Sequence, residues 1–215
     1  MSGVKIDPSN SLTAAYALTR GKTVQELTIE ERDFLAQVGA DWAIEDAPVL
    51  SAKAAAASLA EFFDFARTVK GDQPTVRLRS AGEAGAARDL LEIVQPDRPF
   101  LVDSVMGEIT ESGFRVRAMF HPVVEIDGVA RSFIQVHLDP VGEDRVESLL
   151  EQIRETLFDV RRAVGDFKAM RDLMHRAVAE LAATPGITSE EGRQEDLAFL
   201  RWLEDDNFVF LGARV

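Results

Sequence analysis

The fold is decided by one stretch of the chain, Phe114-Arg-Val-Arg-Ala-Met-Phe-His-Pro-Val-Val-Glu-Ile-Asp-Gly-Val-Ala-Arg-Ser-Phe-Ile-Gln-Val-His-Leu138, which reads as two strands and a tight turn. Asp127-Gly128 favours a two-residue primed turn, because such a turn needs positive φ at both positions. That turn pairs Ile126 with Val129 and fixes the register of the whole hairpin. In this register His121 lies opposite Ile134, and the strands are expected over residues 114–126 and 130–139.

Working outward, the flanking segments supply two more strands and two helices. Residues 75–80 alternate apolar and polar side chains, and residues 89–95 form a short apolar run, so both segments are expected to be strands. Residues 99–112 carry one apolar stripe, formed by Val102, Val105, Met106 and Ile109, and Gly113 is expected to end this helix. A long acidic helix is expected from Glu143. The order βαββα, with residues 75–80 as an additional edge, predicts an α+β ferredoxin-like sandwich with helices on one face of an antiparallel sheet.

The two ends of the chain are expected to add helices to this sandwich. Thr28-x-x-Glu31 is a capping-box pattern, and Ser51 precedes an Ala-rich helical run. After Thr184-Pro185-Gly186 a further helix is expected, and residues 208–215 read as an apolar terminal strand, which suggests a piece of a longer polypeptide. We therefore expect a helical region over 1–74, the core of the sandwich over 75–142, and long helices with a terminal strand over 143–215. The sequence leaves open whether the first helices form their own bundle or pack on the sheet.

Composition limits the classes of function. The 215 residues correspond to one large domain or two small ones, at about 150 residues per domain. A net charge of −13 disfavours nucleic acid and membrane surfaces as partners. There is no cysteine, and no apolar signal-peptide core follows Met1, so a cytoplasmic location is expected.

A catalytic or metal site would have to involve the two histidines of the hairpin. His121 and His137 lie near Glu125 and Asp139 in the sequence, but strand alternation places the two rings on opposite faces of the sheet. A bulge at Pro122 would bring them together. We predict no catalytic residue and no metal ligand in this chain, and keep a small enzyme using His121, His137 or Glu125 as the alternative.

Several stretches of the sequence resemble known families. Residues 96–114 resemble the first strand, loop and helix of ACT domains, which are small modules that bind amino acids. The stretches Arg98-Pro-Phe-Leu-Val-Asp-Ser-Val105, His121-Pro-Val-Val124 and Leu200-Arg-Trp-Leu-Glu-Asp-Asp-Asn-Phe-Val-Phe-Leu-Gly212 resemble the N-terminal region of the large bacterial NAD-specific glutamate dehydrogenases. The residues that match the family motif are Leu101, Val102, Asp103, Ser104, His121 and Pro122.

The resemblance implies a non-catalytic regulatory or assembly domain of an enzyme that converts L-glutamate to 2-oxoglutarate and ammonia. NAD would bind elsewhere in the parent enzyme, with no cofactor in this part. The implied partners are the remainder of the parent enzyme and further copies of the chain. A free-standing amino-acid sensor of the ACT type is the alternative.

An amino-acid effector, if present, is expected at the loop before the second helical segment. The residues implied are Asp97, Arg98, Pro99 and Phe100, because backbone amides at a helix start favour a carboxylate and Arg98 adds a charged donor. Ligand-binding ACT domains commonly place a glycine where this chain has Phe100, and a bulky ring there restricts φ and argues against close approach of a ligand.

Overall fold

The computed structural model describes residues 8–44, 51–81, 87–165, 167–183 and 189–207. The helices are α1 (Pro8–Thr19), α2 (Ile29–Ile44), α3 (Ala52–Thr68), α4 (Leu101–Glu111), α5 (Glu143–Gly165), α6 (Phe167–Ala183) and α7 (Glu190–Trp202), with short helical turns η1 (Val24–Glu26) and η2 (Leu203–Asn207). The strands are β1 (Thr75–Ala81), β2 (Arg88–Pro96), β3 (Val116–Phe120), β4 (Val123–Ile126) and β5 (Val129–Leu138). The strand expected over residues 208–215 lies outside the described residues.

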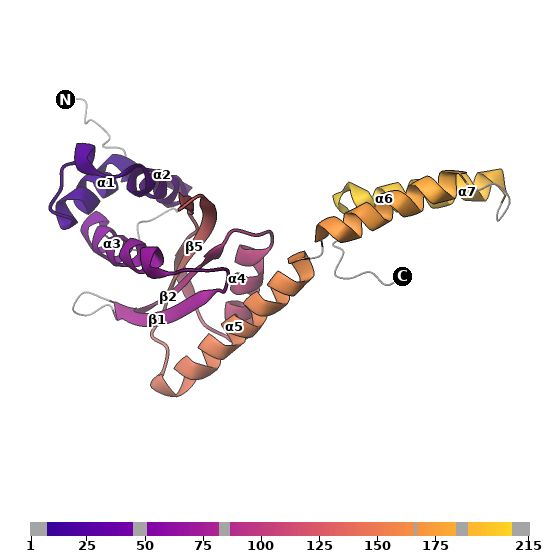
Figure 1. Ribbon diagram of the computed structural model, residues 1–215. Coiled ribbons are helices and arrows are strands. Elements are labelled where there is room, and N and C mark those ends of the chain that lie inside the picture. The colour runs from indigo at the N-terminus through magenta and orange to yellow at the C-terminus, as the bar shows by residue number, and fades with distance from the viewer. Residues whose placement is uncertain (1–7, 45–50, 82–86, 166, 184–188, 208–215) are drawn as a thin grey trace, which may run out of the picture. The chain divides into compact units, whose positions relative to one another are not determined.

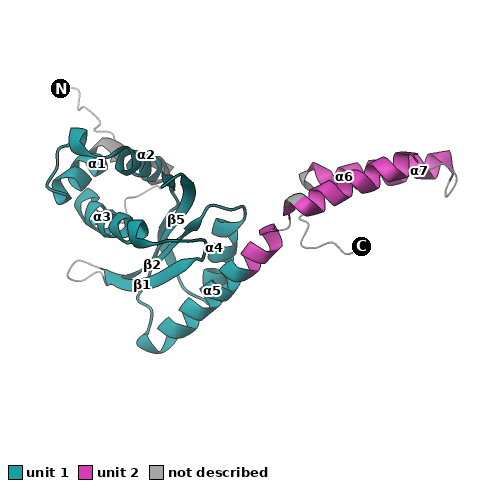
Figure 2. Cartoon of the chain, in the orientation of Figure 1, with its two compact units in different colours: residues 1–158 teal, residues 159–215 magenta. Residues whose placement is uncertain are grey.

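The chain divides into two compact units, residues 1–158 and 159–215 (Figure 2). Unit 1 holds the sheet, α1 to α4 and most of α5. Unit 2 holds the end of α5 and the α6–α7 hairpin. Within the described residues, no helix is both long enough and apolar enough to cross a membrane.

The sheet of unit 1 is antiparallel and has the order β1-β2-β5-β3, with β4 also paired to β5. β5 is its central strand, since β2 lies along one side of it and β3 and β4 lie along the other. β2, α4 and β3 form a split βαβ unit around β5, and β1 occupies the edge next to β2. The predicted α+β, ACT-like sandwich is therefore confirmed.

The hairpin register is confirmed, and one predicted strand is corrected. Ile126 pairs with Val129, and the same register continues to Phe120 opposite Gln135. The segment predicted as a single strand over residues 114–126 is two strands, because Pro122 has no N–H to donate to the ladder. The bulge that was considered at Pro122 lies instead between Val116 and Ala118.

Helices cover both faces of the sheet, which answers the question that the sequence left open. The first three helices, α1 to α3, lie on one side, and α4 and α5 lie on the other (Figure 1). The aromatic contacts on the first side join helices and sheet, since the ring of Phe133 lies 5.6 Å from that of Phe34 and 5.7 Å from that of Phe62. The N-terminal helices thus share a buried cluster with β2, β3, β4 and β5 rather than forming a separate bundle.

The opposite face is covered by α4 and α5. In α4 the buried side chains are Leu101, Val105 and Ile109, so the predicted stripe is correct for the last two. Val102 and Met106, also expected on the stripe, are half-buried. In α5 the buried residues are Leu149, Ile153 and Leu157.

Local signals place the ends of several helices. Thr28 and Glu31 form the expected capping box, with Thr28 N donating to Glu31 at 2.8 Å and Glu31 N donating to the Thr28 hydroxyl at 3.2 Å. The Ser51 hydroxyl accepts from Ala54 N at 3.2 Å and caps α3. Gly113 has φ 74° and ends α4 as predicted. The start of α4 differs from the prediction, because helix begins at Leu101 and Pro99 lies in the turn before it.

Candidate functional site

The predicted effector loop is a surface turn between β2 and α4. Asp97 N donates to Ala130 O at 2.9 Å, which ties the start of the loop to the end of the hairpin. Asp97, Pro99 and Phe100 are exposed and Arg98 is half-buried. The structure therefore brings the four predicted residues together on one accessible turn.

Phe100 adopts a backbone conformation that usually belongs to glycine. Its φ is 66° and its ψ is 6°, which is the left-handed region, and its side chain is 42% exposed. A non-glycine residue in this region carries a strain of about 1–2 kcal/mol. The turn therefore keeps a glycine-like backbone path at Phe100, although a bulky side chain restricts φ, and an exposed ring lies beside it.

The charge balance at the start of α4 is mixed. Phe100 is the N-cap residue and its ring cannot accept a hydrogen bond, so the first-turn amides have no side-chain cap. Such amides favour an anion. Asp103, however, lies in the same first turn and is exposed, and its carboxylate opposes a second negative charge.

The family-motif residues have mainly structural positions. Leu101 is buried in the core, Val102 and Ser104 are half-buried, and Asp103 is exposed. His121 Nε2 lies 2.5 Å from the Ser132 hydroxyl, and the carbonyl of Pro122 accepts a hydrogen bond from Phe133 N at 3.0 Å. His121 and Pro122, which lie between β3 and β4, are therefore held to the central strand β5 by these two contacts.

His121 and His137 lie on opposite faces of the sheet. Ala118 pairs with His137, and His121 lies three residues after Ala118 in the same register. Because side chains alternate along a strand, the two rings point to opposite faces, as the hairpin prediction required. The rings of His137 and Phe120 form a T-shaped pair, with centroids 5.5 Å apart, on the side of the N-terminal helices. Among the described residues there is no group of three or more His, Asp or Glu side chains placed to hold a metal ion.

A buried polar cluster that the sequence did not indicate lies under α3. We call it the Glu92 cluster, and its members are Arg77, Arg79, Glu92, Gln135 and His137. The Glu92 carboxylate has no exposed surface and accepts from Arg77 Nε at 2.6 Å, Arg79 Nε at 3.0 Å and Gln135 Nε2 at 2.8 Å. Two arginines and one amide thus compensate one buried charge.

The Glu92 cluster also holds α3 on the sheet. Arg79 Nη2 donates to the carbonyl of Ser58 at 3.1 Å, and the Ser58 hydroxyl donates to Gln135 Oε1 at 3.3 Å. Glu92 lies in an apolar run and Gln135 lies in the middle of β5. The sequence therefore indicated this cluster only through polar residues at strand positions where buried apolar side chains are expected. Both point toward the N-terminal helices, whose place on the sheet the sequence did not reveal.

His137 is held neutral within this cluster. Gln135 donates its amide to Glu92, so its Oε1 faces His137 Nε2 at 3.1 Å and the imidazole donates through that nitrogen. Burial, followed by the charges of Arg88 and Arg79, lowers the pKa of His137 to about 4. The ring is therefore uncharged at neutral pH.

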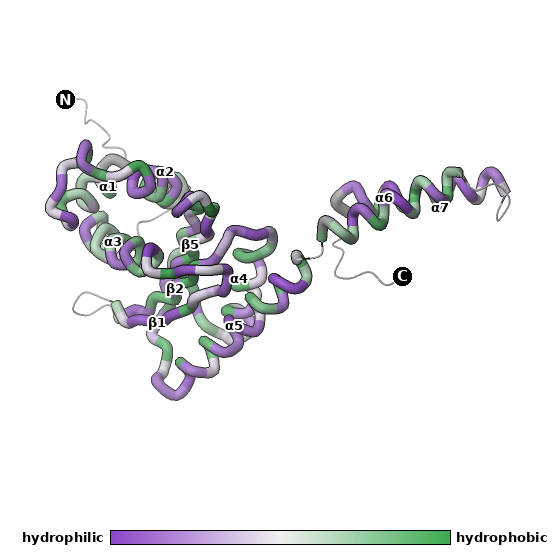
Figure 3. The backbone as a smooth tube through the Cα atoms, in the orientation of Figure 1, coloured by the Kyte–Doolittle hydropathy of each residue, from purple (hydrophilic) through white to green (hydrophobic). Residues whose placement is uncertain are grey.

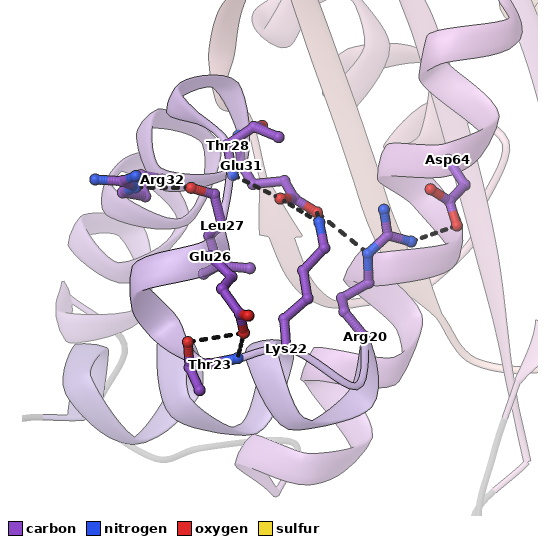
Figure 4. A network of polar contacts seen from close by, with 9 residues as sticks. All are labelled: Arg20, Lys22, Thr23, Glu26, Leu27, Thr28, Glu31, Arg32 and Asp64. Atoms are coloured by element: carbon purple, nitrogen blue, oxygen red, sulfur yellow. Dashed lines mark hydrogen bonds and ion pairs between the residues drawn. The ribbon is translucent and has the colours of Figure 1, made fainter.

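A second network joins the three N-terminal helices (Figure 4). The buried Glu31 carboxylate accepts from Lys22 Nζ at 3.0 Å and Arg20 Nε at 3.2 Å, and Arg20 Nη1 lies 2.5 Å from Asp64 of α3. Burial raises the pKa of Glu31, but the hydrogen bond from Thr28 N and the two cations outweigh it, and the pKa is lowered. The network therefore holds α1, α2 and α3 together.

The neutral His137 generates a prediction about pH. Its pKa is near 6.5 in an unfolded chain and about 4 when folded, so the unfolded state binds more protons between these values. The free energy of unfolding should therefore fall as pH decreases from 6.5 to 4, by up to about 3 kcal/mol from this one group. Urea denaturation across this range should show a smaller slope for His137→Gln than for the unmodified chain. An identical slope in the two proteins would contradict the buried neutral ring.

Comparison with known proteins adds an independent line of evidence. Residues 34–153, more than half of the chain, match the family model described as the glutamate dehydrogenase ACT1 domain. A NAD-specific glutamate dehydrogenase of Halomonas elongata is 32% identical over 147 residues, which cover 57% of this chain and 9% of that protein. A NAD-specific glutamate dehydrogenase of Pseudomonas aeruginosa is 24% identical over an alignment of 235 positions, which covers 97% of this chain and 14% of that protein.

The chain thus spans only a small fraction of the length of these relatives. The matched family segment runs from α2 into α5 and includes the whole sheet. Together with the ACT-like order of strands and helices, the match shows that this chain belongs to the family of glutamate dehydrogenase ACT1 domains, as an N-terminal ACT-like region of the NAD-specific glutamate dehydrogenases.

Proposed function

We propose that the chain is a non-catalytic regulatory or assembly module of a large NAD-dependent glutamate dehydrogenase. The parent reaction is the oxidative deamination of L-glutamate to 2-oxoglutarate and ammonia, with NAD bound elsewhere in the polypeptide and the remainder of the enzyme as partner. The observation that carries the proposal is the coincidence of the family match with the complete ACT-like sheet and its helices. The cytoplasm is the expected location.

The chemistry of the buried polar groups supports a structural role. Glu92 is neutralised by two arginines, Glu31 by a lysine and an arginine, and His137 is neutral and buried. A general base must reach a substrate proton. These groups are instead occupied in fastening helices to the sheet and to one another. The same contacts support regarding residues 1–74 and 75–142 as modules that act together.

Amino-acid binding at the loop of Asp97, Arg98, Pro99 and Phe100 is the second candidate function. It is favoured by the left-handed backbone of Phe100, because strain at an exposed turn is often retained for binding. A ligand carboxylate would meet the first amides of α4 and the guanidinium of Arg98. The exposed carboxylate of Asp103 would weaken this site.

The non-catalytic proposal makes a direct prediction. The purified chain should show no glutamate-dependent reduction of NAD, followed by absorbance of the reduced nicotinamide, whereas the parent enzyme should show it. The chain should bind the separately produced remainder of the parent polypeptide in a pull-down. Turnover by the chain alone would contradict the non-catalytic role, and failure to bind the remainder would contradict the assembly role.

The effector candidate is tested by calorimetric titration with a panel of amino acids. If the loop is a binding site, saturable heat should appear and Arg98→Ala should weaken it by about tenfold or more, the loss of one charge-assisted contact. Asp103→Asn should strengthen binding, because it removes the opposing carboxylate. Saturable heat that is unchanged in both variants would place the ligand elsewhere, and the absence of heat would remove the candidate.

A further inference from the structure

The α6–α7 hairpin buries little of its apolar surface. The two helices have 17 and 13 residues and lie within the second compact unit. Apolar and polar side chains alternate at helical spacing along both (Figure 3). Among the described side chains of α6 and α7 only Met170 is buried, and Leu197 and Leu200 of α7 are half-buried. Since such helices gain most of their stability by packing an apolar face against another element, the hairpin retains surface for a partner.

Helix α7 carries an aromatic pair on the side that α6 does not cover. Leu197 and Leu200, three residues apart, are half-buried on the side of α7 that packs on α6. Successive residues of an α-helix are rotated by about 100°, so Phe199 and Trp202 lie on the opposite side. Their rings are stacked, with centroids 6.2 Å apart, and are 57% and 49% exposed.

The charges beside these rings are negative. Glu195 lies four residues before Phe199, and Glu191 lies four residues before Glu195, so both continue the line of the rings along the helix. Both glutamates are exposed. We call Glu191, Glu195, Phe199 and Trp202 the α7 face. Exposed aromatic rings beside charged side chains are typical of interaction surfaces, and this pattern fits an apolar recess lined by lysine or arginine.

We propose that the α7 face binds a basic surface with an apolar recess, on the part of the parent polypeptide that lies outside this chain. The proposal rests on the assembly role proposed above and names the surface that carries it. The chain covers 9% and 14% of the two relatives, so most of the surface of such a polypeptide lies beyond these residues. The rings would form the centre of the contact and the glutamates its rim.

The charge of the α7 face disfavours a second copy of this chain as the occupant. A two-fold contact through the face would place Glu191 and Glu195 of one copy against the same carboxylates of the other. Two chains of net charge −13 also repel one another at long range. A basic partner removes both penalties. Binding should therefore weaken as salt screens the rim, and persist in part through the rings.

The first experiment compares the α7 face in the intact chain and in the full-length parent enzyme. Hydroxyl-radical labelling of aromatic side chains, measured by mass spectrometry, should modify Phe199 and Trp202 less in the parent enzyme, by about fivefold or more, because the centre of an interface is excluded from water. Sedimentation of the intact chain should show a monomer under the same conditions. Equal labelling in the two proteins overturns the proposal. Rings protected in a dimer of the intact chain assign the face to a second copy and overturn it too.

The second experiment measures how tightly the intact chain binds the separately produced remainder of the parent polypeptide. Phe199→Asp should raise the dissociation constant by about tenfold or more, since it places a charge at the centre of the contact. Glu191→Lys combined with Glu195→Lys should do the same, because a basic partner would repel the lysines. The matched controls are Ala179→Asp and Asp172→Lys, at exposed positions of α6, and they should leave the dissociation constant unchanged.

The outcomes separate this proposal from the assembly role. Circular dichroism of each variant should match that of the unmodified chain. Binding that the α7 variants leave undiminished overturns the α7 face and keeps the assembly role. If the unmodified chain does not bind the remainder, the assembly role between separate chains fails, and labelling of the rings in the parent enzyme decides the α7 face by itself.

Discussion

The arrangement of unit 1 depends on one strand that is buried on both faces. β5 lies at the centre of the sheet, and its register is fixed at the Asp127-Gly128 turn, where both residues have positive φ. Because side chains alternate along a strand, Phe133, Gln135 and His137 face the N-terminal helices, and Ile134, Val136 and Leu138 face α4 and α5. A shift of one residue would exchange these two sets and place Gln135 and His137 against the wrong helices.

The Glu92 cluster shows how a polar group can be tolerated in such a position. An unpaired carboxylate with no exposed surface would cost several kcal/mol, but two arginines and an amide surround this one. These contacts join side chains from β1, β2, β5 and α3, so the cluster favours one alignment of the four elements. The Glu31 network does the same between the three N-terminal helices (Figure 4). In both cases charge specifies the position of a helix whose apolar packing is less directional.

The sequence predicted the features that local chemistry determines. The hairpin register followed from Asp127-Gly128, the starts of α2 and α3 from Thr28, Glu31 and Ser51, and the family from the motif that begins at Arg98. The place of the N-terminal helices on the sheet could not be predicted, because helical periodicity shows that a face is apolar without naming its partner. The left-handed Phe100 was missed since no local rule places a bulky residue there, and the loop Asp97–Phe100 remains a proposal as a site. The Glu92 cluster was missed because its members come from separate strands, and the sequence does not show that β1, β2 and β5 pair and bring these side chains together.

Native-state hydrogen exchange tests most directly whether β5 joins the N-terminal helices and the sheet into one cooperative unit. Backbone amides of α3 and β5 would be followed in increasing, sub-denaturing concentrations of urea. The shared aromatic cluster and the Glu92 cluster predict that the slowest amides of both elements exchange with the same free energy and the same urea dependence. Exchange of the α3 amides through an opening of much lower free energy, while the β5 amides stay protected, would contradict this account.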